Sequence, residues 1–418
     1  MHRPSLFPRF AESALTEALA DTPVVLLHGP RQCGKTTLAR AVGERAGYGY
    51  YTFDDASTLA AATEDPVGFV DELPPRAILD EVQRVPHLFA TLKVAVDRDR
   101  TPGRFLLTGS ANVLLVPHLS DSLAGRMEIV RLHPLTQSEL AGKDVDFVGA
   151  LFDGKVPSGT RPRLARGLAE RVATGGYPAA VQRPSARRRA AWYRDYVEAL
   201  VQRDVRELAR IAALDALPRL LSLAAAQTAK LLNVSDLAAP FQVSRPTIRD
   251  YVTLLERVFL IDTLPPWHSN RLSRLVKTPK LHVGDTGLAC ALLGLDADGL
   301  WEDRPSLGPL LETFVFQELR RQASWRHAGV RFFHFRNRDG VEVDLVLERG
   351  ARELAGVEVK AGATVTASDF RGLQRLRQAT GARFKAGVVL YDGEATLRFG
   401  DGMHAVPLRA LWEGTASR

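Results

Sequence analysis

The sequence is poor in the features that mark secreted, membrane-spanning and zinc-ribbon proteins. Cysteine occurs only twice, as Cys33 and Cys290, which excludes a disulfide framework and a zinc site built from paired cysteines. The first ten residues lack the apolar core of a signal peptide, and no run approaches the roughly eighteen apolar residues of a membrane span. These absences favour a protein of the reducing cytoplasm with no membrane partner.

Neither the charge nor the hydrophobicity of the chain is extreme. The hydrophobic fraction of 45% and the charged fraction of 25% are typical of a globular protein. A length of 418 residues exceeds what one hydrophobic core usually serves, so we expect several domains. The 55 basic against 48 acidic residues give a net charge of +7, a mild excess that permits nucleic-acid binding without requiring it.

A glycine-rich segment that begins at Gly29 matches G-x-x-x-x-G-K-[ST], between the apolar run PVVLLH and a helical pattern. In such a loop, backbone amides surround phosphates, Lys35 reaches the β- and γ-phosphates, and the Thr36 hydroxyl ligates Mg²⁺. We therefore expect ATP and Mg²⁺ as cofactors. The residues expected to contact the nucleotide are Gly29, Pro30, Arg31, Gln32, Cys33, Gly34, Lys35, Thr36 and Thr37.

The run AILDE predicts a strand that ends in two carboxylates beside this loop. Asp80 is expected to hold Mg²⁺ through water, and Glu81 either acts as the general base for the attacking water or is a surface carboxylate. A further strand, FLLTGS, ends in polar groups that are expected to sense the γ-phosphate. Ser110 is favoured for that role, with Thr108 and Asn112 as alternatives.

Two residues near this site each have two interpretations. Arg126 is a candidate for stabilising the transition state, from its own chain or from a neighbour in a homo-oligomer, or else it forms a surface ion pair. Cys33 lies close to Lys35, so it is either a thiol of lowered pKa that oxidises readily or simply a small residue.

Changes in pattern divide the chain into five parts. Short apolar runs alternate with helical patterns over residues 1–147, which predicts an α/β domain with a parallel sheet and crossover helices. Residues 148–216 are Arg-rich and are interpreted as a helical, mostly solvated connector. We expect a winged helix-turn-helix over 217–266, a linker over 267–299 and a second α/β domain over 300–418.

The second helix of the expected helix-turn-helix has a clear apolar stripe. Ile248, Val252 and Leu255 recur at helical spacing, and Ser244 is a candidate N-cap. The side chains expected on or near its outer face are Arg245, Thr247 and Arg249. This arrangement suits either contact with double-stranded DNA or packing against protein.

Near the C-terminus, VEVDLVL and VEVK read as two strands of a hairpin. Alternation predicts that Val343 and Leu345 share one face, with Asp344 on the other, while Glu358 and Lys360 lie together. Glu312 falls on the apolar face of the preceding helix, where an unpaired carboxylate is costly. These four polar side chains form either an ion-pair network or a site for chemistry.

The segments GPRQCGKTTL, LDEVQRVP, LLTGS, SLAGR, HPLTQSE and GGYP together resemble a prokaryotic AAA-type P-loop ATPase family whose C-terminal domain is uncharacterised. The resemblance extends over essentially the whole chain. It implies an extra strand between the P-loop strand and the DE strand, supplied by YYTFDD or FLLTGS. It also implies a nucleotide-driven switch or motor.

The C-terminal domain of that family resembles PD-(D/E)XK nucleases. The resemblance implies that Asp344 and Glu358 bind Mg²⁺, that Lys360 orients water, and that Glu312 completes the site. One departure is that Gln374 has no Tyr after it, as such nucleases often do. Three functions follow: a DNA-directed ATPase, an ATP-gated nuclease, or a non-hydrolysing switch that recruits a protein partner.

Overall fold

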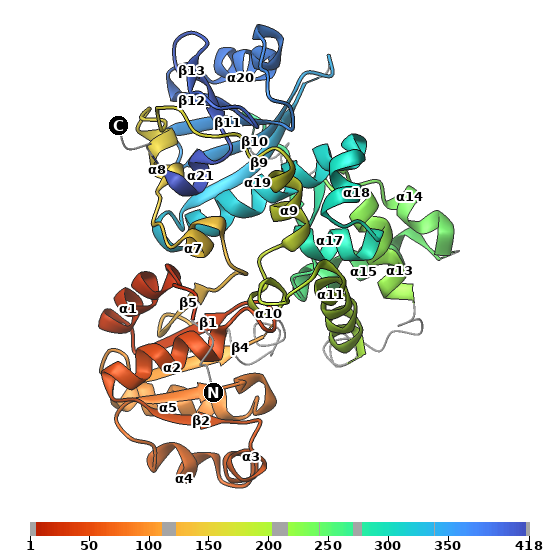
Figure 1. The fold of residues 1–418 in the computed structure, drawn as a ribbon. Helices are drawn as coiled ribbons and strands as arrows, with labels where there is room; N and C mark the ends of the chain where they lie inside the picture. Colours follow the sequence, from red (N-terminus) through yellow and green to blue (C-terminus); the bar gives the residue numbers. More distant parts are fainter. Residues whose placement is uncertain are drawn as a thin grey trace.

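The structure is a computed structural model in which two α/β regions lie one above the other, with a helical region to one side (Figure 1). The residues that it describes are 6–110, 123–202, 216–241, 243–270, 278–337 and 339–414. Within these ranges, no helix is both long and apolar enough to cross a membrane.

The N-terminal region is an α/β domain. Its strands are β1 (Val24–His28), β2 (Gly49–Thr52), β3 (Ala77–Asp80), β4 (Phe105–Gly109) and β5 (Met127–Arg131). Its helices are α1 (Ala11–Asp21), α2 (Lys35–Ala46), α3 (Ala56–Glu64), α4 (Pro66–Asp71) and α5 (Leu88–Arg98). The five strands pair in parallel in the order β2-β3-β4-β1-β5, which confirms the expected parallel sheet.

This order decides which run supplies the extra strand. FLLTG forms β4, which lies between β1 and β3, whereas the YYT run forms β2 at the outer side of β3. Alternate side chains of the strands pack on opposite faces: Leu26 and Leu107 with α5, Leu27 and Leu106 with α1 and α2. The domain therefore has three layers, with the sheet in the middle.

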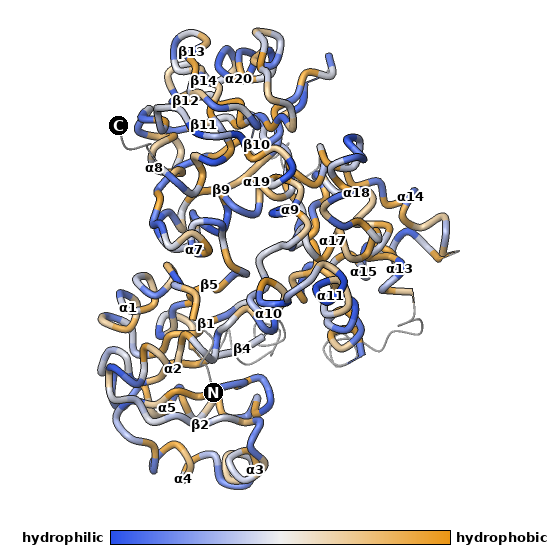
Figure 2. The backbone as a smooth tube through the Cα atoms, viewed as in Figure 1, coloured by the Kyte–Doolittle hydropathy of each residue, from blue (hydrophilic) through white to orange (hydrophobic). Residues whose placement is uncertain are grey.

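The helical region follows β5. Its elements are α7 (Gln137–Ala141), α8 (Phe147–Phe152), α9 (Arg166–Thr174), α10 (Pro178–Val181), α11 (Ala186–Leu200), α13 (Ala216–Ala226), α14 (Val234–Ala238), α15 (Arg245–Arg257), α17 (Thr286–Leu293) and α18 (Ala297–Glu302). The expectation that 148–216 is mostly solvated is wrong, because side chains such as Leu151, Leu168 and Tyr193 are almost fully buried in one large core. Figure 2 shows α17, an apolar helix with six buried residues, among the helices of this region.

Three short strands join the helices α13 to α17. They are β6 (Lys230–Leu231), β7 (Ile261–Leu264) and β8 (Lys280–Val283), and they pair antiparallel in the order β6-β8-β7. The interpretation of 267–299 as a linker is therefore wrong, because it contains the central strand of this sheet and the buried helix α17. The expected helix pair is present as α14 and α15.

The C-terminal region is the second expected α/β domain. The long helix α19 (Arg304–Arg326) precedes β9 (Val330–Arg336), β10 (Glu342–Arg349), β11 (Glu353–Lys360), α20 (Arg371–Thr380), β12 (Phe384–Tyr391), β13 (Leu397–Arg398), β14 (Met403–Pro407) and α21 (Ala410–Glu413). The sheet order is β13-β14-β12-β11-β10-β9, and β10 and β11 form the expected antiparallel hairpin.

A register shift in β10 corrects one expectation about its faces. The pairing with β9 is irregular between Val343 and Val346, and both of these side chains pack in the core under α20. Leu345 and Leu347 pack instead in the core that contains α19. Val343 and Leu345 therefore do not share a face, because a bulge breaks the alternation of side chains next to Asp344.

Candidate nucleotide-binding site

The expected phosphate loop lies at the carboxyl edge of the parallel sheet. It runs from Gly29, after β1, to Gly34, which precedes α2 with a φ of 101° in the left-handed region. A Cβ at Gly29 would lie 2.0 Å from the Leu132 carbonyl oxygen, so only glycine fits there. Because α2 begins at Lys35, its N-terminal amides point into the loop, which is the arrangement that binds anions.

Lys35 is buried inside the loop. Its ammonium donates hydrogen bonds to the carbonyl oxygens of Gly29 and Pro30, at 3.0 and 2.9 Å. The remaining expected contact residues, from Arg31 to Thr37, form the loop and the first turn of α2 as the motif predicts. The loop carries a positive charge and a helix N-terminus at one point, as a phosphate requires.

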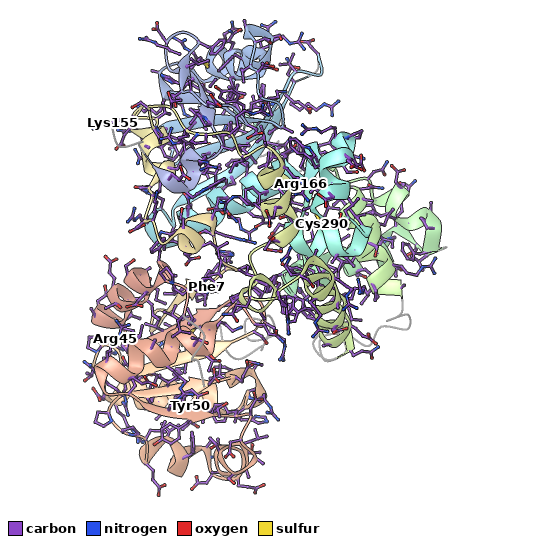
Figure 3. The ribbon with its side chains drawn as sticks, viewed as in Figure 1. Phe7, Arg45, Tyr50, Lys155, Arg166 and Cys290 are labelled. Atoms are coloured by element: carbon purple, nitrogen blue, oxygen red, sulfur yellow. The ribbon has the colours of Figure 1, made fainter. Side chains whose placement is uncertain are left out.

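Asp80, at the end of β3, is the centre of a hydrogen-bond cluster. The Thr36 hydroxyl donates to its Oδ1 at 3.0 Å, and the Tyr50 hydroxyl donates to its Oδ2 at 2.8 Å. Thr108 on β4 also donates to it. Burial, and then the bond to Asp80, raises the pKa of Tyr50 to about 12, so this phenol stays a donor. Figure 3 shows Tyr50 on the N-terminal domain, where β2 pairs with β3.

Glu81 and Ser110 are brought together by a side chain that the sequence did not single out. Gln83 Nε2 donates to the Glu81 carboxylate and, at 3.2 Å, to the Ser110 hydroxyl. The Glu81 backbone has a φ of 60°, and its amide donates to the Thr108 hydroxyl at 3.3 Å. The Asp80 carboxylate and the Glu81 backbone amide thus both contact Thr108 of β4, and the alternative Asn112 lies outside the described residues.

Arg9 contacts the phosphate loop through its side chain. Its guanidinium donates to the carbonyl oxygens of Cys33 and His133, both at 2.6 Å, and to Glu139 Oε1 at 3.0 Å. Cys33 itself is fully buried, and burial raises the pKa of its thiol despite the nearby Lys35 and Arg9. The interpretation of Cys33 as a reactive thiol is therefore wrong, and the small buried residue is the better account.

Arg126 lies at the opposite edge of the sheet. It precedes β5, its carbonyl accepts from the Val24 amide at the start of β1, and its guanidinium pairs with Asp97 at 2.6 Å. Because the phosphate loop follows the other end of β1, a role for Arg126 at its own nucleotide does not fit. The ion-pair interpretation does fit, and a role in a neighbouring copy of a homo-oligomer stays a prediction.

The candidate C-terminal residues also lie together, but around an unexpected lysine. Lys280 of β8 donates to Glu312 Oε1 at 2.8 Å and to Asp344 Oδ1 at 3.3 Å. Lys360 pairs with Glu358 at 3.4 Å and with Asp369 at 3.8 Å. The alternative of an ion-pair network is therefore present, with Lys360 paired to Glu358 and Lys280 rather than Lys360 in direct contact with Asp344.

The pKa values of the carboxylates in this cluster are shifted mainly by burial. Burial, and then the Asp344 charge, raises the pKa of Glu358 to about 8 and the pKa of Glu312 well above its usual range. Burial alone lowers the pKa of Lys280, but Asp344 and Glu312 outweigh it and the net shift is upward. Among the described residues, no group of three or more His, Cys, Asp or Glu side chains is arranged to hold a metal ion.

The residues that sequence reasoning missed are joined to the site by long-range contacts. Arg9, Tyr50, Gln83 and Lys280 were given no role by the sequence, although Tyr50 and Gln83 lie within the runs YYTFDD and LDEVQRVP. Gln83 had a weak signal, because it follows Glu81 by two residues in a tight turn. The others required knowledge of which strands pair.

Comparison with known proteins agrees with this geometry. Residues 21–141 match the model of an AAA domain, and residues 165–299 and 307–411 match two domains of unknown function, DUF8612 and DUF4143. The uncharacterized proteins Rv2008c of Mycobacterium tuberculosis and Mb2031c of Mycobacterium bovis are each 33% identical over 96% of this chain and 83% of their own length. The chain belongs to the family of these mycobacterial proteins. It is thus an AAA-domain protein with a C-terminal domain that resembles theirs.

Among solved structures, the Walker-type ATPase PABY2304 of Pyrococcus abyssi is similar with a TM-score of 0.38 at 16% identity, covering 70% of this chain and 97% of that one. A similarity this low is no evidence for the function of the chain. The boundaries of the matched models agree with the structure, since 165–299 includes β8 and α17.

Proposed function

We propose that this protein binds ATP with Mg²⁺ and hydrolyses it to ADP and phosphate. The observation that carries the proposal is the convergence of Lys35, Thr36, Asp80 and Glu81 at one edge of the AAA domain. The Thr36 hydroxyl and the Asp80 carboxylate are the hard oxygen ligands that Mg²⁺ prefers, and bound Mg²⁺ neutralises charge on the phosphates.

Other residues of the chain bind the phosphates and activate the attacking water. Lys35 and the α2 amides bind the β- and γ-phosphates, and Glu81 accepts the proton of the attacking water. Ser110 shares Gln83 with Glu81, which suits a residue that responds to the γ-phosphate. A non-hydrolysing ATP-binding switch would use the same loop but would need no base at Glu81.

The test is Mg²⁺-dependent phosphate release from wild type, Lys35→Ala and Glu81→Gln, each with and without duplex DNA. We expect at least a hundredfold loss of kcat in both variants, with Glu81→Gln still binding ATP. Matched controls are Lys155→Ala and Glu64→Gln, whose side chains are exposed and form no ion pair with a described residue. No multiple turnover by the wild type under any condition would favour the switch.

We further propose that ATP turnover is coupled to double-stranded DNA through a winged helix-turn-helix. Support comes from α13, β6, α14, α15, β7 and β8, whose order along the chain and β6-β8-β7 sheet match such a module. Ile248, Val252 and Leu255 are buried, and Ser244 caps α15 by accepting from the Thr247 amide. The exposed face of α15 carries Arg245 and Arg249, neither in an ion pair with a described residue.

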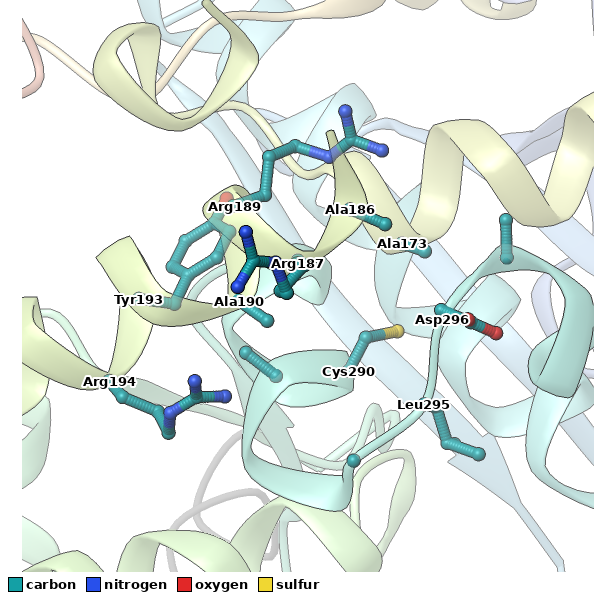
Figure 4. A pocket seen from close by; sticks show the side chains of 14 residues that line it. Ala173, Ala186, Arg187, Arg189, Ala190, Tyr193, Arg194, Cys290, Leu295 and Asp296 are labelled. Carbon is teal, nitrogen blue, oxygen red and sulfur yellow. The ribbon is translucent and has the colours of Figure 1, made fainter. Parts of the chain in front are cut away.

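A second group of arginines supports binding of a polyanion. Arg187, Arg189 and Arg194 project from α11 around a cavity of about 230 Å³ that Cys290 also lines (Figure 4). None of the three forms an ion pair with a described residue. Arginines that are grouped on one surface and have no ion pair with a described residue are suited to bind the phosphate backbone of nucleic acid.

Binding of fluorescein-labelled duplex DNA at several salt concentrations tests this coupling. Arg245→Ala/Arg249→Ala is expected to weaken binding at least tenfold and to reduce the slope against log salt by about two. The control, Arg352→Ala/Arg371→Ala, removes two exposed arginines from the C-terminal domain. Equal weakening by both pairs would indicate non-specific attraction to the net charge.

The alternative of an ATP-gated nuclease acting through Asp344, Glu358 and Lys360 has less support. Its support is the succession of α19, the β10-β11 hairpin, α20 and β12 along the chain. A metal ion does not fit well, because the Lys280 ammonium already contacts Asp344 and Glu312, while Glu358 pairs with Lys360.

A further inference from the structure

Lys280 connects three elements that are distant in the sequence. It projects from β8, and its ammonium lies 2.8 Å from Glu312 Oε1 on α19 and 3.3 Å from Asp344 Oδ1 on β10. The lysine side chain is 5% exposed, and the two carboxylate side chains are 13% and 12% exposed. A buried cation is therefore shared between two buried carboxylates of the C-terminal domain.

The ammonium uses the oxygens that a divalent cation would need. A metal bridging Glu312 and Asp344 would take these same oxygens at about 2.0–2.4 Å, and two cations at that spacing repel strongly in a buried site. The second oxygen of Asp344 accepts the Val359 amide at 3.0 Å, so both oxygens of this carboxylate already have a hydrogen-bond donor. The site is thus already neutralised by a protein cation.

The neighbouring carboxylate does not rescue a metal site. Glu358 Oε1 pairs with Lys360, which leaves Glu358 Oε2 as the one oxygen of this carboxylate without a hydrogen-bond partner among the described residues. A single free oxygen is too few for Mg²⁺, which asks for several oxygen ligands in near-octahedral geometry. Lys360 in turn also contacts Asp369, so it is engaged on two sides.

We propose that Lys280 is the resident counter-cation of this site, and that it excludes divalent metal ions and fastens the three-stranded sheet to the C-terminal domain. The cluster of Lys280, Glu312, Asp344, Glu358 and Lys360 is then a set of ion pairs that joins two parts of the chain, which we call the ion-pair lock. Removing one partner of a buried pair leaves an uncompensated charge and strongly destabilises the fold, so these ion pairs favour one arrangement of β8 against β10.

The test measures Mn²⁺ binding to the full-length protein without nucleotide. The electron paramagnetic resonance signal of free Mn²⁺ reports how much of the ion has bound. Wild type and Asp344→Asn are expected to bind the same number of ions, because Asp344 holds none. Lys280→Met, which keeps the length but removes the charge, is expected to gain one Mn²⁺ per chain and to melt at a higher temperature when Mn²⁺ is added. Lys280→Arg retains a cation and should gain none.

Two results would overturn the proposal. One is a Mn²⁺ ion bound by the wild type and lost in Asp344→Asn; the other is a folded Lys280→Met that gains no ion. If Lys280→Met folds poorly, adding Glu312→Gln and Asp344→Asn must restore the melting temperature, since the unpaired charges are then gone. A triple variant as unstable as Lys280→Met would contradict the ion-pair lock.

Discussion

The ring of Phe259 packs against the ring of His28, with their centroids 5.1 Å apart. His28 ends β1 directly before Gly29 of the phosphate loop, and Phe259 lies two residues after the end of α15. Phe259 has a φ of 62°, in the left-handed region that costs a bulky residue on the order of 1–3 kcal/mol. A residue with a strained backbone thus joins the proposed DNA-binding helix to the nucleotide site.

Phe259→Ala is expected to uncouple the two sites. Removing the ring breaks the contact with His28 but leaves Lys35, Asp80 and Glu81 in place, so basal phosphate release should stay within about threefold of wild type. Stimulation by duplex DNA should be lost. Phe384→Ala, a half-buried ring in the C-terminal domain, serves as the control. Full DNA stimulation in the Phe259 variant would place the coupling elsewhere.

Gln83→Ala is expected to lower kcat about tenfold with little change in the KM for ATP. The Gln83 amide holds both the Glu81 carboxylate and the Ser110 hydroxyl, so its loss disorders the general base without touching the phosphate contacts. Steady-state phosphate release distinguishes the two constants. Gln182→Ala, on the exposed surface, should behave as wild type; a Gln83 variant with wild-type kcat would mean that Glu81 needs no such support.

The sequence predicted what depends on local pattern. The loop before α2, the carboxylates after β3 and the apolar stripe of α15 follow from spacing within about fifteen residues, and the structure has all three. The extra strand between β1 and β3 remained open between two runs, because periodicity identifies a strand but not its neighbours.

What the sequence did not predict depends on pairing between distant segments. Tyr50 reaches Asp80 only because β2 pairs with β3, and Arg126 lies away from the loop only because β5 runs parallel to β1. Lys280 was hidden in a segment interpreted as a linker, although that short strand is central in its sheet. Because of the bulge in β10, Val343 packs in a different core from Leu345, which the regular alternation of side chains along a strand does not predict.

Gly29→Ala is expected to abolish ATP binding and to lower the melting temperature. The new methyl carbon would lie 2.0 Å from the Leu132 carbonyl oxygen, which is backbone and has no rotamer to change. Binding of a fluorescent ATP analogue and thermal unfolding report the two effects. The matched control is Gly308→Ala in α19, where no atom lies within 4 Å of the new carbon and a helical alanine should be neutral or stabilising by up to about 1 kcal/mol. Equal behaviour of the two variants would contradict the close approach at Gly29.

His28 is expected to make the protein less stable in mild acid. Burial, with Arg131 and Lys35 adding to it, lowers the pKa of His28 to about 3, whereas an unfolded histidine titrates near 6.5. Between these values the unfolded chain binds a proton that the folded chain does not, so the stability is complete above about pH 6.5 and is lost as the pH falls towards 3.

His28→Asn removes this titration, so the fall in melting temperature from pH 7.5 to pH 5 should shrink by roughly 3–6 °C. Part of the fall should persist, because burial also lowers the pKa of His133, His282 and His334. His87→Asn, whose ring is exposed, should leave the fall unchanged. If His28→Asn keeps the full fall, then His28 takes up its proton in the folded state, and its packing against Phe259 must open in acid.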